Sequence, residues 1–124
     1  MRGDAKQEWR STAEALRHVN VIVHAGAYIP HNQNDAADAQ RCFDANALGT
    51  LNLLRACELA KIRSFIYVSS ASVLSPRLAF VQEDDPVGCE HSLYYSGSKL
   101  LGEVYVRAKI YRGMDGLIIR PSAI

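Results

Sequence analysis

The sequence predicts an α/β domain in which three strands alternate with helices and form a parallel sheet. Three short apolar runs rich in β-branched residues indicate the strands, at 19–24, 64–69 and 117–120. Longer segments with apolar residues at helical spacing separate them, at 8–17, 35–61 and 92–112. This alternation is typical of βαβ units, whose crossovers join parallel strands.

The first strand follows a modest amphipathic helix and ends in three small residues, Ala25-Gly26-Ala27. Val21-Ile22-Val23 has the continuous apolar character of a strand buried on both faces, as in the centre of a parallel sheet. Only one other strand follows it directly in the chain. We therefore expect its second edge to lie open, a hazard for aggregation.

The two longer predicted helices each precede a strand. In 35–61, apolar side chains recur at helical spacing and predict a core-facing stripe: Phe43, Ala47, Leu51, Leu54, and Cys57 or Leu59. Gly113 and Gly116 bracket a turn after the helix 92–112, and Pro121 ends the third strand.

Composition excludes several classes of partner. The formal net charge is +1, the pI is about 7.8 and no basic stripe is present, so neither nucleic acid nor a membrane surface is an expected partner. No apolar run approaches the ~20 residues of a membrane span, and no signal peptide opens the sequence. We expect a cytoplasmic protein with reduced cysteines. The four histidines and three cysteines have no metal-ligand spacing, so no metal site is expected.

Three residue types suited to proton transfer follow one another along the chain. Tyr95 and Lys99 are four residues apart, so on a helix they share one face. Ser70 follows the second strand at its carboxyl end, where open α/β sheets place their ligands. Tyr105 and Lys109 repeat the same spacing. They lie about 15 Å further along the helix among apolar residues, so we interpret that second pair as structural.

These residues, in this order, resemble the Ser–Tyr–Lys triad of the short-chain dehydrogenase/reductase superfamily, and most closely its extended branch, the NAD-dependent epimerase/dehydratase family. The segments 21–27, 46–54, 83–86, 98–103 and 120–124 also resemble the family pattern. One departure is Leu74-Ser75, where the family usually has Tyr-Gly. It weakens any inference about the sugar-binding loop.

The resemblance implies a partial Rossmann-type domain, residues 1–124, that forms the latter half of an NAD(P)-binding unit. Since no glycine-rich turn between strand and helix is present, we expect truncation at both ends and no activity of this chain alone. The cofactor would be NAD or NADP. The residues that the resemblance assigns to it are Asp4, Ala25, Gly26, Ala27, Asn46, Val68, Ser69, Tyr95, Lys99, Pro121 and Ser122.

The implied catalytic residues are Ser70, Tyr95 and Lys99. The Lys99 ammonium would lower the pKa of Tyr95 from about 10 by about two units, so that Tyr95 could act as a general base. Ser70 would hold the substrate hydroxyl. The substrate class that the family suggests is a nucleotide sugar, selected by a C-terminal domain outside this sequence.

Two alternatives stay open. The same triad serves hydroxysteroid-type dehydrogenases and reductases of this branch, and a non-catalytic dinucleotide-binding regulatory module would keep the sheet without the chemistry. The resemblance also suggests a homodimer through the helices 35–61 and 92–112. Leu54, Tyr105 and Val106 would then face the partner.

Overall fold

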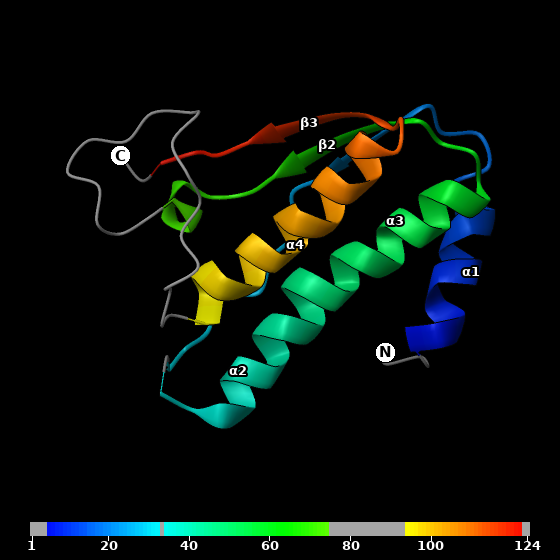
Figure 1. The fold of residues 1–124 in the computed structure, drawn as a ribbon. Helices are drawn as coiled ribbons and strands as arrows, with labels where there is room; N and C mark the ends of the chain where they lie inside the picture. Colours follow the sequence, from blue (N-terminus) through cyan, green and yellow to red (C-terminus); the bar gives the residue numbers. More distant parts are fainter. Residues whose placement is uncertain (1–4, 33, 75–93, 123–124) are drawn as a thin grey trace.

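The computed structural model describes residues 5–32, 34–74 and 94–122, and it confirms the α/β class with three parallel strands alternating with helices (Figure 1). In chain order the elements are α1 (Ala5–Ala15), β1 (Val21–His24), α2 (Ala36–Cys42), the π-helical segment η1 (Phe43–Leu48), α3 (Gly49–Leu59), β2 (Ser64–Val68), the short 3₁₀ helix η2 (Ala71–Val73), α4 (Tyr94–Tyr111) and β3 (Asp115–Ile119).

The sheet has the order β1-β2-β3, and both pairings are parallel. Burial alternates along the central strand β2: Phe65 and Tyr67 are buried, whereas the other three residues of the strand are half-buried. Phe65 and Tyr67 pack with Leu54 and Val106 from the helices, so the hydrophobic core lies between β2 and the pair α3 and α4.

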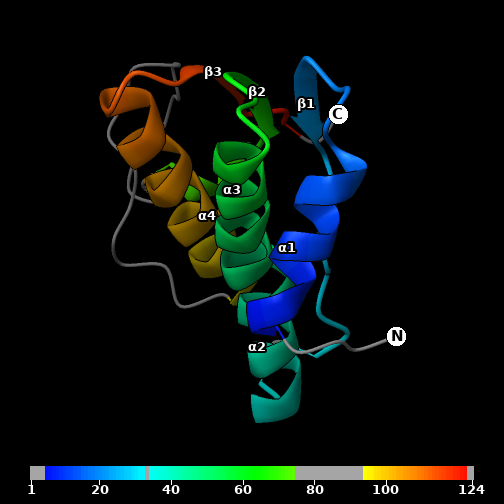
Figure 2. The same ribbon diagram turned by 90° about the vertical axis from the view of Figure 1, so that its right-hand side faces the viewer.

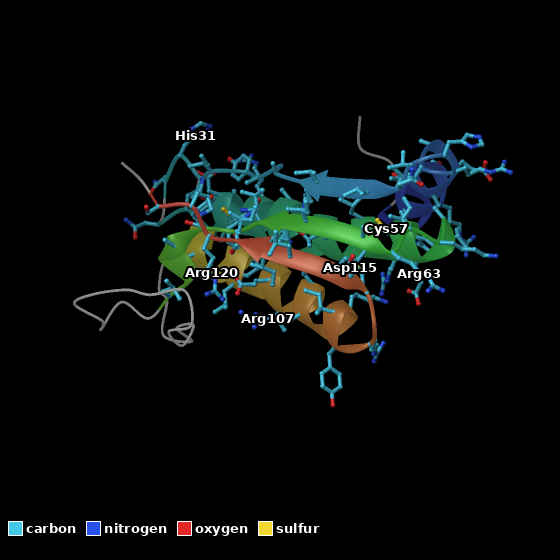
Figure 3. All side chains as sticks on the ribbon, turned by 90° about the horizontal axis from the view of Figure 1, so that it is seen from above. His31, Cys57, Arg63, Arg107, Asp115 and Arg120 are labelled. Atoms are coloured by element: carbon cyan, nitrogen blue, oxygen red, sulfur yellow. The ribbon has the colours of Figure 1, made fainter. Side chains whose placement is uncertain are left out.

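All described helices lie on one face of the sheet (Figures 1 and 2). The other face is open to view in Figure 3, and its outward apolar side chains are 44 to 61% exposed: Val21, Val23, Leu117 and Ile119. The prediction that the first strand is buried on both faces is therefore wrong for the described residues, because their helices cover only one face. Its open second edge is confirmed for the part of the chain that the structure describes, where β1 pairs with β2 and with no other strand.

The predicted helix 35–61 is one continuous rod of α2, η1 and α3. Its buried positions recur every four residues, at Asp38, Cys42, Asn46, Thr50 and Leu54. In a pure α-helix each such step turns the side chain by about 40° further round the axis. The wider π-helical turns of η1 offset this drift and keep the five residues on one face.

The same change of phase alters the predicted stripe. Ala47 and Leu54 are buried as predicted and Leu51 is half-buried, whereas Phe43 is 37% exposed. Of the two alternatives at the end of the stripe, Cys57 is buried and Leu59 is 56% exposed. Cys42 and Cys57 are both buried free thiols. Asp35 caps the start of the rod, and its carboxylate accepts a hydrogen bond from the Ala37 N–H.

Helix α4 packs against α3 and η1, and it buries Val106 completely. The prediction that Leu54 and Val106 face a partner is therefore wrong, because both side chains turn toward Phe65 and Tyr67 under the sheet. Tyr105 is half-buried against the same core. The outward position on this part of α4 is Val104, which is 48% exposed.

Gly113 ends α4 with φ +109°, a conformation that side-chain-bearing residues rarely adopt. The chain then enters β3 at Asp115, two residues earlier than the predicted third strand. Gly116 lies within this strand because a side chain there would collide with Ile110 of α4. Within the ranges that the structure describes, no helix has the length and apolar character needed to cross a bilayer.

Candidate active site

The carboxyl ends of the strands bring three chain segments to one edge of the sheet. Beyond the regular ladder, the Ser69 N–H donates to the Ile119 carbonyl at 2.7 Å, and the Ala71 N–H donates to the Pro121 carbonyl at 3.0 Å. Ser70 therefore lies between two backbone hydrogen bonds to the segment after β3. Pro121 and Ser122, which are both exposed, lie beside it.

Ser70 has an extended backbone and caps η2. Its hydroxyl oxygen accepts from the Ser72 N–H at 3.2 Å, and it lies 2.9 Å from the Ser72 hydroxyl. The turn thus fixes the position of the Ser70 hydroxyl at the end of β2. The cap explains why a polar residue follows the apolar strand at this point.

Tyr95 and Lys99 lie one turn apart on α4, which packs against η2. Lys99 is buried, and its Nζ donates to the Val68 carbonyl at 2.7 Å and lies 4.6 Å from the centre of the Tyr67 ring. Burial lowers the pKa of Lys99, and the nearby Glu103 carboxylate acts in the opposite direction. The structure thus places the Lys99 ammonium group against the end of β2, two residues before Ser70.

Tyr95 is half-buried, and burial raises the pKa of its phenol, with Cys42 acting in the same direction. The sequence predicted a lowering by Lys99. In the structure the direction is opposite, because burial dominates, and the Lys99 ammonium is directed at Val68 and Tyr67. Tyr95 is therefore protonated at neutral pH in this arrangement.

Asn46 joins the loop after β1 to the Tyr95 turn. Its side-chain carbonyl accepts from the Tyr28 N–H at 2.7 Å, and its amide donates to the Tyr28 carbonyl at 2.9 Å. The amide also lies 3.0 Å from the Ser98 hydroxyl, which in turn donates to the Tyr95 carbonyl. Neither Tyr28 nor Ser98 was singled out from the sequence, where the one available signal was an asparagine in mid-helix.

Asp38 is a second anchor of this loop that the sequence did not reveal. Its carboxylate accepts hydrogen bonds from the Tyr28 hydroxyl at 2.8 Å and from the Asn32 N–H at 2.8 Å, and Arg41 lies at 3.0 Å. The Asn32 N–H, followed by the Tyr28 hydroxyl, lowers the pKa of Asp38 to about 2. An ionised side chain therefore holds residues 28–32 against α2.

His24 ends β1 on the helical side, and its Nε2 lies 2.9 Å from the Thr50 hydroxyl. Burial, together with the charge of Lys99, lowers the pKa of His24 to about 4. Since Thr50 also donates to the Asn46 carbonyl at 2.7 Å, a neutral imidazole completes a hydrogen-bonded link from β1 to η1.

Ala25, Gly26 and Ala27 are exposed at the edge of the sheet. A Cβ at Gly26 would have its nearest neighbour, in His24, at 3.8 Å, an ordinary contact. Packing within the chain therefore does not require a glycine here. Small residues on exposed backbone beside Ser70 and Lys99 fit the ribose and nicotinamide part of a dinucleotide. Asp4 lies outside the described residues.

A parallel sheet with Ser70 and the Lys99 ammonium group at the carboxyl end of β2, and Tyr95 one helical turn before Lys99, is typical of the short-chain dehydrogenase/reductase class. The chain belongs to the NAD dependent epimerase/dehydratase family, whose profile matches residues 4–124.

Three known proteins illustrate the similarity. A 3 beta-hydroxysteroid dehydrogenase/Delta 5-->4-isomerase of Mycobacterium tuberculosis is 32% identical over 120 residues, covering 90% of this chain and 32% of the relative. A short-chain dehydrogenase/reductase superfamily protein from Agrobacterium tumefaciens, solved with bound NAD, is 33% identical with a TM-score of 0.74 over 89% of this chain and 33% of its own.

The third is DesIV, a dTDP-glucose 4,6-dehydratase from Streptomyces venezuelae solved as a double mutant with NAD and DAU bound. It is 29% identical with a TM-score of 0.79, over 95% of this chain and 36% of its own. The chain thus spans about a third of the length of these relatives.

Proposed function

We propose that this chain supplies the proton-transfer half of an NAD(P)-dependent oxidoreductase site in the intact protein, meaning this sequence with whatever precedes and follows it. Tyr95 exchanges a proton with the substrate oxygen, Ser70 hydrogen-bonds that oxygen, and Lys99 supplies positive charge beside them. NAD or NADP, when bound, would accept or donate the hydride.

The placement of Lys99 carries this proposal. A lysine that is 1% exposed sits with its Nζ on the Val68 carbonyl, two residues before Ser70 and one helical turn after Tyr95. Burying an ammonium group costs free energy, which hydrogen bonds and nearby opposite charge offset only in part, so a buried lysine is a candidate for a functional role. Here the charge lies at the edge of the sheet where ligands of such folds bind.

The Tyr95 phenol can exchange a proton with the substrate in either direction of the reaction. A phenol that stays protonated at neutral pH is suited to donate a proton to a substrate carbonyl as that carbonyl is reduced. The oxidation of a hydroxyl uses the same group in reverse, as a base. Ser70 stabilises the oxygen in both directions because its hydroxyl can donate or accept a hydrogen bond.

The substrate class that we propose first is a nucleotide sugar. Its support is the likeness to DesIV, whose structure contains NAD and DAU. The identity of 32% to a hydroxysteroid dehydrogenase supports the second candidate, a 3β-hydroxysteroid. A panel of UDP- and dTDP-hexoses and 3β-hydroxysteroids, assayed with NAD and NADP by the absorbance of the reduced nicotinamide, distinguishes the two.

The decisive variant is Tyr95→Phe in the intact protein. Loss of the proton-transfer group should lower kcat by about 10²- to 10⁴-fold, with little change in NAD affinity. Tyr105→Phe is the matched control, since it removes the same hydroxyl ten residues later on the same helix. Unchanged turnover in Tyr95→Phe would refute the proposal. Binding of NAD without any turnover that depends on Tyr95 would favour the regulatory module instead.

For this chain alone, we propose that it is inactive, because the glycine-rich turn that holds the pyrophosphate is absent from its sequence. Calorimetric titration of the purified 124-residue chain with NAD tests this. Micromolar binding by a folded chain would show that other residues hold the phosphates.

We also propose a homodimer through α3 and α4, now through their outward residues. Leu48, at the end of η1 directly before α3, is 38% exposed, and Val104 of α4 is 48% exposed. Sedimentation of the intact protein as a monomer would contradict this arrangement.

A further inference from the structure

We propose that Glu103 is a positioning residue that ties the carboxyl ends of β2 and β3 together and so places Ser70 beside Pro121 and Ser122. Its effect on catalysis rests on the function proposed above. The tie itself does not, because it is a property of the folded chain.

Glu103 is fully buried on α4, and its carboxylate is surrounded by donors from three elements. The Ser69 hydroxyl donates to Oε2 at 2.8 Å, and Arg107 Nε donates to Oε1 at 3.2 Å. Arg120 binds both oxygens, with Nε 3.2 Å from Oε2 and an Nη2 contact to Oε1. Both carboxylate oxygens therefore have two partners each.

Two of these donors, Ser69 and Arg120, come from the strand ends that carry candidate site residues. Ser69 directly precedes Ser70, and Arg120 directly precedes Pro121. Figure 3 shows Arg120 just beyond the end of β3 and Arg107 on α4 on the same side of the sheet. Among the described residues, the backbone hydrogen bonds Ser69–Ile119 and Ala71–Pro121 also join the two strand ends, and the carboxylate adds side-chain contacts to them.

A neutral side chain cannot replace this carboxylate. The two-fold contact from Arg120 needs two acceptor oxygens, and a glutamine offers only one. Its amide would point hydrogens at the Arg120 guanidinium or at the Ser69 hydroxyl. Glu103 also counteracts the effect of burial on the pKa of Lys99 one turn earlier. Glu103 therefore acts both on the strand ends, through Ser69 and Arg120, and on the charge of Lys99.

The test is amide hydrogen exchange in the intact protein carrying Glu103→Gln. We expect exchange of the Ser69 and Ala71 amides to become about tenfold faster or more, while amides within β2 keep their wild-type rates, because local opening frees only the strand end. Glu58→Gln is the matched control. The Glu58 carboxylate of α3 accepts a hydrogen bond from Lys109 of α4 at 2.8 Å, at an exposed position remote from the strand ends.

A second readout is NAD affinity by calorimetry. We expect the Kd for NAD to rise about tenfold in Glu103→Gln, because the strand ends that carry candidate cofactor-binding residues would be displaced. In Glu58→Gln the Kd should stay unchanged. If Glu103→Gln does not fold, Ser69→Ala decides the matter. It removes a single hydroxyl from the carboxylate and should speed exchange of the same two amides to a smaller extent.

Unchanged exchange at Ser69 and Ala71 would overturn the inference, and so would equal acceleration throughout the sheet, because that would indicate a general loss of stability. Failure of the proposed function has a different signature. Tyr95→Phe would then keep full turnover, or the wild-type protein would not bind NAD, whereas the exchange result would still support or overturn the tie.

Discussion

At Gly102, α4 lies close to the backbone of η1, and replacement of this glycine by alanine tests that packing. A Cβ at this position would overlap the Tyr67 hydroxyl and would lie 2.8 Å from the Asn46 carbonyl oxygen. Ordinary contacts begin near 3.4 Å, so the helix and η1 would have to separate by about half an ångström. The obstacle is backbone, which cannot turn away.

Two opposing contributions set the magnitude. Alanine stabilises a helix interior by about 1 kcal/mol relative to glycine, whereas overpacking of a dense core costs about 1–3 kcal/mol. Because a backbone oxygen and a buried phenol both block the new methyl, we expect the upper end of that range. The net loss of unfolding free energy should be about 2 kcal/mol.

Gly97→Ala is the matched control on the same helix. Its Cβ would have its nearest neighbour, in Phe43, at 3.9 Å, so the methyl group fits without movement. That variant should gain about 0.5–1 kcal/mol from the smaller entropy of its unfolded state. Urea unfolding of both variants of the intact protein gives the comparison. Equal stability of the two variants would refute the packing argument.

Two further predictions concern the groups that hold the loop after β1. Because the pKa of His24 is about 4 when folded and 6.5 when unfolded, its contribution to stability should be present above pH 6.5 and lost as pH falls toward 4. This contribution of His24 to the free energy of unfolding amounts to at most about 3 kcal/mol. His24→Gln should remove this part of the pH dependence of urea unfolding. Asp38→Asn should weaken NAD binding by the intact protein several-fold, since one neutral oxygen cannot serve Tyr28, Asn32 and Arg41 together. Asp44→Asn is its control, because the Asp44 carboxylate accepts a hydrogen bond from the exposed Gln40 side chain. Equal NAD affinity in both variants would contradict a role for the Asp38 anchor.

The order of helices and strands could be predicted because each element carries its own periodicity, as Phe65-Ile66-Tyr67 does in β2. The burial of whole faces could not be predicted in this way. Val21 and Val23 have the sequence of a central strand, but their exposure depends on which elements cover the sheet. The phase of Phe43 and Leu59 likewise depended on the π-helical turns of η1, which no local pattern indicated.

For the candidate site, the spacing of Tyr95 and Lys99 was sufficient to place both on one helix face. Where the Lys99 ammonium is directed was not, because its partners Val68 and Tyr67 lie about thirty residues away in the chain. The expectation that Lys99 lowers the pKa of Tyr95 was wrong for the same reason. The Asp38 anchor carried no recognisable local signal, and Glu103 was part of a family-like segment but without an assigned role.

The sequence by itself determined the alternation of strands and helices, the family, and the three side chains suited to proton transfer, because each depends on neighbours within a few residues. Only the tertiary structure decided what these groups contact. Ser69 and Arg120 reach Glu103 across 34 and 17 residues of chain, and they do so because parallel strands end at one edge beside α4. Burial and charge at that edge then set the pKa values of Tyr95, Lys99 and His24.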